Sequence, residues 1–453
     1  MRNFHFETAL LPNGWASDVV IACEDGMIAD MSVGMPCPPF TDRLAGVAVP
    51  GVANLHSHAH QRALAGLAER SAAVGGGMGE DSFWTWREAM YRVVQAITPE
   101  DLQDIAMHAY VEMLQGGYTH VAEFHYLHHQ PDGTPYADRG EMARRVRAAA
   151  QAAGIGMTLL PALYVAGGFG EPAGAGQARF VNGLDGFATL LAGADGVAAH
   201  SLRAVPAGEL AGLLQLAPTG PVHIHVAEQP AEVAACLAAT GQRPVAWLLD
   251  HADVDGRWCL VHATQTDAAE VAGIAARGAT VGLCPTTEAD LGDGVFAAAA
   301  FQAAGGRFGV GSDSQVSASW LEEVRLLEWG QRLVSGRRTV LAGGPGRSTG
   351  RSLVEAAARG GAAACGGAAA CGVATACGVA GGAIEVGARA DVVVLAGRGE
   401  DAALDRAVFA PRGNPVRHVV AGGECVVRDG RHRLADIAAE RFQRVMARLE
   451  ALA

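Results

Sequence analysis

Two histidines that stand one residue apart, His56 and His58, end an apolar run over residues 47–55. In a β-strand, residues i and i+2 point to the same face of the sheet. The two imidazoles would therefore project together and form part of a metal site. A His-x-His pair also arises by chance, so its significance depends on further ligands elsewhere in the chain.

Ionisable residues also follow several other apolar segments. They are Glu123 and His125, His200, His225, His262, and Asp313. Each alone has a plainer interpretation, as a buried structural histidine or a solvated carboxylate. The interior of a (β/α)8 barrel is apolar, whereas its catalytic groups stand at the carboxyl ends of the strands. Six such strand ends in one chain indicate a shared site at that face.

Three nitrogen ligands and one oxygen ligand can be drawn from these residues: His56, His58, His225 and Asp313. This set suits Zn²⁺, and ligand type alone also allows Fe²⁺ or Mn²⁺. The set contains no thiolate, which favours a catalytic metal over a closed structural zinc site. We therefore expect one Zn²⁺ per chain, acting on a water whose proton a nearby carboxylate can take.

Glu228 and His262 are candidates for proton transfer. Glu228 comes three residues after His225, just past the predicted strand, so it would reach the substrate rather than the metal. There it could carry a proton to a leaving nitrogen. The plainer alternative is a solvated loop glutamate. His262 ends its own strand and could polarise the attacked centre or hold the water.

The elements that must position these residues alternate between strand and helix. Thr98-Pro99-Glu100-Asp101 is typical of a helix start, and that helix would run to Gly116. The first strand ends at His56–His58, and the other strand candidates span residues 118–124, 156–163, 197–200, 222–226, 258–262, 280–284 and 308–311. Eight such units predict an α/β fold, a TIM-like (β/α)8 barrel over residues 49–383, although a doubly wound sheet shows the same alternation.

Both ends of the chain instead show short strands and turns. Residues 16–23 and 27–31 favour strands near the N-terminus, and residues 390–395 and 416–430 do so near the other end. Neither piece could bury a core alone. We therefore predict one small β-sandwich-like domain from residues 1–48 and 384–432, followed by a C-terminal helix over residues 433–453.

Composition narrows the class of protein. Of 453 residues, 50% are hydrophobic, and the net charge of −13 without a basic block argues against nucleic-acid binding. Nine scattered cysteines and an N-terminus without an apolar core favour the cytoplasm. Residues 360–384 carry no charge, but they are mostly Ala and Gly, which favours a small-residue helix and an insertion over a membrane span.

The order and context of the candidate residues resemble the deaminases of the amidohydrolase superfamily. The similar segments are Asn54-Leu55-His56-Ser57-His58, His225-x-x-Glu228, Val261-His262-Ala263 and Gly311-Ser312-Asp313-Ser314. The resemblance implies a metal-dependent TIM-like barrel with a small β-domain built from both termini.

A narrower resemblance, over residues 5–435, is to the formimidoylglutamate deiminase family of histidine degradation. It rests on segments 61–63, 82–88, 122–126, 200–205 and 287–294. It implies a homodimeric zinc enzyme that converts N-formimino-L-glutamate, a small anionic amino-acid derivative, to N-formyl-L-glutamate and ammonia. It also implies that Asp313, His262 and Glu228 are catalytic, and that substrate is bound by Gln61, Arg87, Tyr126, His200 and Arg203.

Some residues depart from that family's pattern. His60 stands where an aromatic residue is expected, and Gln315 where a histidine is expected. Loop 70–81 has extra glycines, and the Ala/Gly/Cys-rich stretch 360–383 looks inserted. Two other functions stay open: a deaminase of a purine or pterin ring, which would favour stacking and amide groups over two arginines, and a non-catalytic, assembly-forming relative, which would have lost metal ligands.

Overall fold

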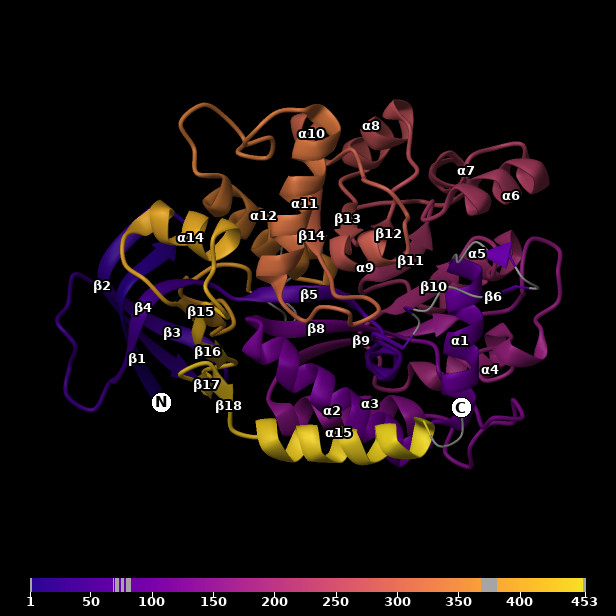
Figure 1. Cartoon of the computed structure of the whole chain (residues 1–453), viewed down its shortest axis with the longest axis horizontal. Helices are drawn as coiled ribbons and strands as arrows, with labels where there is room; N and C mark the ends of the chain where they lie inside the picture. The colour runs from indigo at the N-terminus through magenta and orange to yellow at the C-terminus, as the bar shows by residue number, and fades with distance from the viewer. Residues whose placement is uncertain are drawn as a thin grey trace.

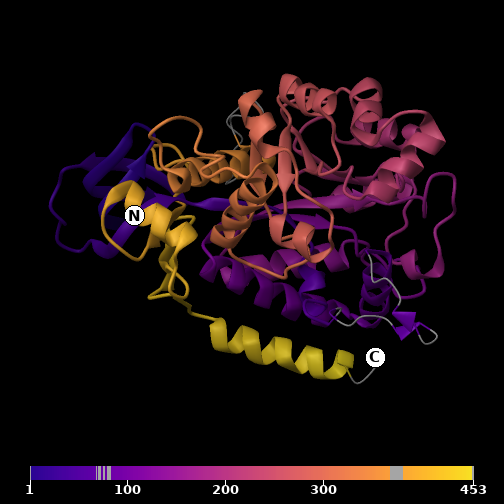
Figure 2. The ribbon, with the colours of Figure 1, turned by 45° about the horizontal axis from the view of Figure 1, so that its top comes forward.

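The computed structural model describes residues 2–67, 69, 73–74, 77–78, 83–367 and 381–450. It contains a barrel of parallel strands covered by helices, with a second sheet packed at one side (Figure 1). Turning the molecule shows the last helix lying along the outside of the barrel, apart from the second sheet (Figure 2). Among the described helices, none is both long and apolar enough to cross a bilayer.

The barrel consists of eight parallel strands in the order β14-β13-β12-β11-β10-β9-β8-β5. Their bounds are β5 (Val52–Ser57), β8 (Tyr118–His125), β9 (Gly156–Leu163), β10 (Val197–Ser201), β11 (Val222–Val226), β12 (Trp258–His262), β13 (Thr280–Leu283) and β14 (Arg307–Val310). A parallel bridge between Ser57 and Asp313 closes the ring. The predicted (β/α)8 barrel is therefore confirmed.

Most predicted strands agree with these bounds to within one residue, but the first apolar run divides into two strands. Strand β4 (Asp42–Pro50) pairs within the second sheet, and β5 begins the barrel at Val52. Gly51 joins them where a Cβ would lie 2.7 Å from the Cβ of Asp391, so a larger residue would not fit without a shift. The residues on both sides of Gly51 are apolar, so the sequence does not show that the chain passes from one sheet to the other here.

Helices of the barrel layer connect the strands. They are α1 (Phe83–Ala96), α2 (Pro99–Gln115), α3 (Glu141–Ala153), α4 (Leu184–Ala188), α5 (Ala207–Leu216), α6 (Pro230–Thr240), α7 (Pro244–His251), α8 (Ala268–Arg277), α9 (Pro285–Asp290), α10 (Ala298–Ala303), α11 (Trp320–Ser335) and α12 (Thr349–Ala364). Helix α2 starts as predicted, since Thr98 and Asp101 form a capping box.

Close packing against the barrel explains the small residues at the end of α12. A Cβ on Gly360 would overlap the backbone of Phe308 in β14, and one on Gly361 would lie 2.7 Å from the carbonyl oxygen of Ala53 in β5. The helix therefore approaches the barrel as closely as backbone allows, which confirms a small-residue helix there. Residues 368–380 of the predicted insertion, and most of loop 70–81, lie outside the described residues.

The second sheet combines both ends of the chain, as expected. Its order is β18-β17-β16-β15-β4-β1-β2-β3. The remaining bounds are β1 (Arg2–Leu11), β2 (Gly14–Glu24), β3 (Met27–Val33), β15 (Val392–Leu395), β16 (Val416–Ala421), β17 (Glu424–Arg428) and β18 (Arg431–His432), with α14 (Glu400–Phe409) and α15 (Ala435–Glu450) after or between them. The predicted residue limits of the domains stay predictions.

A buried hydrogen-bond cluster holds the seam where the barrel closes. Asn54 Nδ2 donates to Ser312 Oγ at 2.6 Å, and Asn54 Oδ1 accepts from the backbone N–H of Ser312 at 3.0 Å and of His56 at 3.3 Å. Across the same seam, the N–H of Asp313 donates to the carbonyl of His56 at 3.0 Å. One amide side chain thus joins the first strand to the segment after the last.

Replacing that amide should destabilise the protein. Asn54→Ala leaves the buried N–H groups of Ser312 and His56 without their acceptor, and each unsatisfied buried donor costs about 1–3 kcal/mol. We expect the free energy of unfolding to fall by about 2–4 kcal/mol in urea titrations followed by circular dichroism. Asn13→Ala, at an exposed turn, serves as the control and should change it by less than about 0.5 kcal/mol. Equal losses in both variants would contradict the role given to the seam.

Candidate active site

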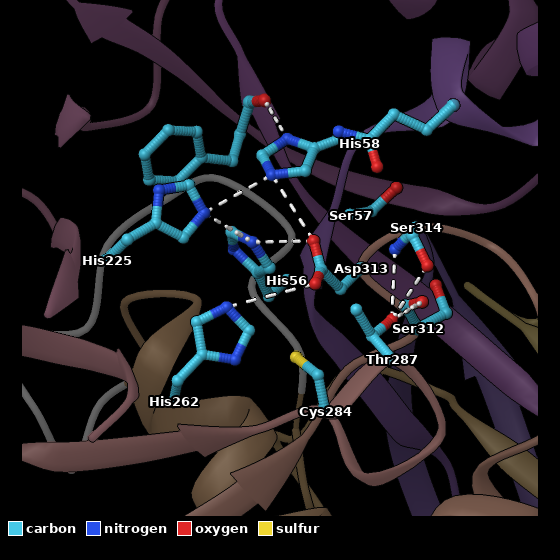
Figure 3. A network of polar contacts seen from close by, with 12 residues as sticks. His56, Ser57, His58, His225, His262, Cys284, Thr287, Ser312, Asp313 and Ser314 are labelled. Atoms are coloured by element: carbon cyan, nitrogen blue, oxygen red, sulfur yellow. Dashed lines mark hydrogen bonds and ion pairs between the residues drawn. The ribbon is translucent and has the colours of Figure 1, made fainter. Parts of the chain in front are cut away.

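Three imidazoles and one carboxylate point at a common centre at the carboxyl end of the barrel strands (Figure 3). The Nε2 atom of His225 lies 3.0 Å from Nε2 of His56 and 3.3 Å from Nε2 of His58. Asp313 Oδ1 lies 3.3 Å from Nε2 of both His56 and His58. The structure therefore brings together all four residues expected to bind metal.

The outer nitrogens of two rings define which atoms face the centre. His58 Nδ1 lies 2.8 Å from the carbonyl oxygen of Phe124, and His225 Nδ1 lies 2.7 Å from that of His200. A carbonyl only accepts, so both Nδ1 atoms carry the hydrogen and both Nε2 atoms present lone pairs inward. Two lone pairs that face each other at 3.3 Å repel unless a cation lies between them.

The spacing and ionisation of the ligands also fit a divalent cation. Ligand atoms about 2.0–2.1 Å from a tetrahedral zinc stand roughly 3.3 Å apart, as these atoms do. Burial lowers the pKa of His56 to about 3, so its ring is neutral and able to coordinate. Burial alone raises the pKa of Asp313, but the hydrogen bond from His56 and the neighbouring imidazoles lower it below its usual range.

Unusual backbone conformations aim several of these side chains. Ala227, His262, Ala263, Asp313 and Gln315 all have φ between 46° and 67°, in the left-handed region that non-glycine residues rarely adopt. All five lie at or just beyond the ends of β11, β12 and β14. Such strain is retained only where surrounding contacts enforce it, and it commonly marks functional sites.

His262 and Glu228 lie beside the ligand cluster. His262 Nε2 is 3.7 Å from Glu228 Oε1 and 3.8 Å from Asp313 Oδ2, while its Nδ1 is 3.4 Å from Glu288 Oε1. Burial lowers the pKa of His262, but the carboxylates of Glu228, Glu288 and Asp313 outweigh burial and raise it well above its usual value. The imidazole can therefore hold a proton between these carboxylates.

Glu228 is enclosed rather than solvated. Its side chain is largely buried, and burial raises its pKa to about 7, against the opposing effect of His262. A carboxyl with a pKa near neutrality can both accept and donate a proton under physiological conditions. The position therefore agrees with a proton-transfer group and not with the alternative of a loop glutamate in water.

One cavity, which holds about 520 Å³ when its opening to solvent is counted, connects these groups to all five residues expected to bind substrate. Its lining includes Gln61, Arg87, Tyr126, His200 and Arg203, together with His58, His225, Glu228, His262 and Asp313. Within the described part of the chain, Gln61 Oε1 and Arg203 Nη1 are buried without a hydrogen-bond partner. An unused acceptor and an unused cationic donor in one cavity indicate contacts kept for a ligand.

Several lining residues were not predicted from the sequence: Trp86, Met90, Tyr91, Tyr164, Phe180 and Leu291. Two of them left a usable signal. Tyr164 directly follows β9, as other cavity residues directly follow their strands. Tyr91 lies four residues after Arg87 on α1, so helical spacing places it on the same face.

Glu123 and His125, at the end of β8, do not line the cavity. Glu123 accepts hydrogen bonds from Ser57 Oγ and the backbone N–H of Ala59, both at 2.8 Å, and from Tyr110 at 3.0 Å. It thereby fixes the residues on both sides of His58. Glu123 therefore supports the site from outside the cavity.

The two departures from the family pattern also lie behind the cavity lining. His60 is buried and its ring packs edge-on against that of Tyr126, with centroids 4.9 Å apart. Gln315 donates to Ser57 Oγ at 3.0 Å and to the carbonyl oxygen of Asp313 at 2.9 Å. Neither side chain lines the cavity, so neither departure changes its surface.

Comparison with known proteins agrees with this geometry. The chain is 47% identical to the formimidoylglutamate deiminase of Pseudomonas aeruginosa over an alignment 463 positions long, gaps included, which covers 98% of each protein. A crystal structure of an amidohydrolase from Brucella melitensis superposes with a TM-score of 0.92 at 46% identity, covering 99% of this chain and 100% of that one.

A more distant structure shares the fold alone. It is an adenosine deaminase from Xanthomonas campestris with bound zinc, which superposes with a TM-score of 0.77 at 21% identity over 99% of this chain and 98% of that one. Residues 47–426, most of the sequence, match the profile of the Amidohydrolase family. The chain therefore belongs to the amidohydrolase family.

Proposed function

We propose that this protein catalyses the hydrolytic deimination of N-formimino-L-glutamate to N-formyl-L-glutamate and ammonia, a step of histidine degradation. The proposal rests mainly on one cavity that is lined by three of the four metal-binding residues, His58, His225 and Asp313, and also by Arg87 and Arg203. The 47% identity to the Pseudomonas deiminase over nearly the whole chain supports the same substrate.

The cavity suits a small dianion that carries a polar nitrogen group. A guanidinium binds a carboxylate through two parallel hydrogen bonds, and this substrate offers two carboxylates. The protein's net charge of −13 repels a dianion at long range, so local cations must supply the affinity. Gln61, which donates to Tyr126 at 2.8 Å, keeps its buried carbonyl oxygen for an N–H group of a ligand.

His56, His58, His225 and Asp313 would hold one divalent ion, for which we propose Zn²⁺, with Fe²⁺ or Mn²⁺ compatible with the same ligands. When bound, such an ion supplies Lewis acidity, which polarises the substrate and makes water a better nucleophile near neutral pH. The tautomers set by the carbonyls of Phe124 and His200 keep the imidazole lone pairs directed at it.

The chain's own residues move the protons. Asp313 Oδ2 stands 3.8 Å from His262 Nε2, so the two can hold the attacking water and take its proton. Glu228, 3.7 Å from the same nitrogen, would carry a proton to the departing nitrogen. Both protons of the water thus reach the nitrogen, the C=N double bond of the formimino group is replaced by C=O, and the nitrogen leaves as ammonia.

The rival functions fit the cavity less well. Aromatic side chains do line it, as a purine or pterin deaminase would require, but a neutral ring offers no carboxylate to either arginine. A non-catalytic relative would have lost ligands, whereas all four converge here. We also propose a cytoplasmic homodimer; the seven free thiols among the described residues support a reducing compartment, and the dimer rests on family resemblance.

Metal content is the first test. Purified protein should contain one tightly bound divalent ion per chain, most of it zinc, by inductively coupled plasma mass spectrometry. His56→Ala and His225→Ala each remove one of four ligands and should lose both the metal and ammonia release. Full activity in a preparation without metal would contradict the assignment.

The second test separates proton transfer from metal binding. Glu228→Gln keeps the shape of the side chain but cannot carry the proton, so kcat should fall by about 10²–10⁴ while metal content stays at the wild-type level. Glu24→Gln, on an exposed strand end far from the cavity, is the matched control and should leave both unchanged. A wild-type kcat in the Glu228 variant would show that Glu228 does not transfer a proton in the reaction.

The third test asks what the arginines recognise. Arg87→Met or Arg203→Met removes charge-assisted hydrogen bonds worth about 1.5–3 kcal/mol, so kcat/KM should fall by roughly 10- to 150-fold. The loss should shrink for a formimino compound that lacks one carboxylate. Arg337→Met, at an exposed position, is the control. Equal losses on both substrates would show that neither arginine binds a carboxylate.

A further inference from the structure

Asp293, in the loop between α9 and α10, has a buried carboxylate whose two oxygens differ in their contacts. Oδ1 accepts a hydrogen bond from Gln229 Nε2, and the backbone carbonyl of the same residue accepts one from Gln265 Nε2. The side chain of Asp293 is 2% exposed, and its Oδ2 has no hydrogen-bond partner in the described structure. The loops after β11 and β12 thus fix a carboxylate that keeps one oxygen unused.

That carboxylate faces the two proton-transfer residues. One ligand atom each from Glu228, His262 and Asp293 lie within 4.8 Å of one another, and Glu228 Oε1 is 3.7 Å from His262 Nε2. Glu288 and Asp313 approach the same imidazole, at 3.4 and 3.8 Å. Four buried carboxyl groups therefore surround one histidine, and three of them remain once Asp313 is assigned to the first metal.

We propose that Glu228, His262 and Asp293 form a second, weaker site for a divalent cation, whose occupation inhibits the enzyme. One imidazole nitrogen and two carboxylate oxygens suit Zn²⁺ or Mn²⁺. Binding at this site does not depend on the proposed function, but inhibition does, because a cation there withdraws Glu228 and His262 from proton transfer. The site is distinct from the His56–His58–His225–Asp313 cluster and shares no ligand with it.

The second site should bind more weakly for two physical reasons. Its one pair of ligand atoms in close approach, Glu228 Oε1 and His262 Nε2, lies 3.7 Å apart, compared with 3.0–3.3 Å between the paired atoms of the first cluster, so side chains must move to coordinate an ion. Protons also compete for it, since burial, with the charge of Glu228 added, raises the pKa of Asp293 to about 9. A cation must displace such a proton to bind.

The experiment begins with enzyme that contains one equivalent of zinc per chain. Equilibrium dialysis against increasing Zn²⁺, with metal counted by mass spectrometry, should show a second equivalent that binds in the same concentration range in which ammonia release is inhibited. Asp293→Asn keeps the shape of the side chain and should weaken the second equivalent at least 10-fold while the first stays bound. Asp253→Asn, at an exposed position, is the matched control and should bind both equivalents normally.

Glu228→Gln provides a second variant that does not depend on activity, because its readout is metal stoichiometry: it too should lose the second equivalent. Anomalous diffraction from zinc-soaked crystals should place that ion among Glu228, His262 and Asp293. A single equivalent up to millimolar Zn²⁺, or a second one bound equally by both variants, would overturn the site. A second equivalent that binds here to an enzyme inactive on formimidoylglutamate would instead overturn the proposed function and leave the site standing.

Discussion

The convergence of three imidazole nitrogens and one carboxylate on a single point is the constraint on which the rest of this structure depends. The Nε2 lone pairs of His58 and His225, which repel each other, are held 3.3 Å apart because the Nδ1 atom of each ring donates to a backbone carbonyl on its far side. A divalent cation placed between these nitrogens attracts both lone pairs. The protein therefore holds the ligands in an arrangement that favours metal binding. The left-handed backbone conformations of His262 and Asp313 also direct these two side chains toward the site.

The contacts that close the barrel also position the metal ligands. The strand that carries His56 is joined to the segment that carries Asp313 by the hydrogen bond from the N–H of Asp313 to the carbonyl of His56 and by the Asn54–Ser312 pair. Glu123 accepts hydrogen bonds from the Ser57 hydroxyl and the Ala59 backbone N–H, one on each side of His58. Stability of the fold and geometry of the metal cluster are therefore coupled, because a loosened seam would separate the ligands it aligns.

The barrel and the central chemistry were predictable because their physical signals are local. Buried parallel strands are continuous apolar runs, and a polar residue that ends such a run stands out, as His225, His262 and Asp313 do. The break at Gly51 could not be seen, since the strands on both sides are equally apolar and only tertiary contact with Asp391 reveals the change of sheet. Asp293 was missed because an aspartate in a loop is ordinary in sequence, and its significance comes from burial beside Glu228.

The central claim is that one cavity combines a metal cluster with groups that recognise a dicarboxylate. The most direct measurement is kcat/KM for ammonia release by the metal-loaded enzyme, compared across N-formimino-L-glutamate, formimino-amino acids with a single carboxylate, and free purine and pterin bases. We expect the highest value for N-formimino-L-glutamate, a lower value for each monocarboxylate, and no measurable release from the ring compounds. Faster release from a purine or pterin than from N-formimino-L-glutamate would contradict it.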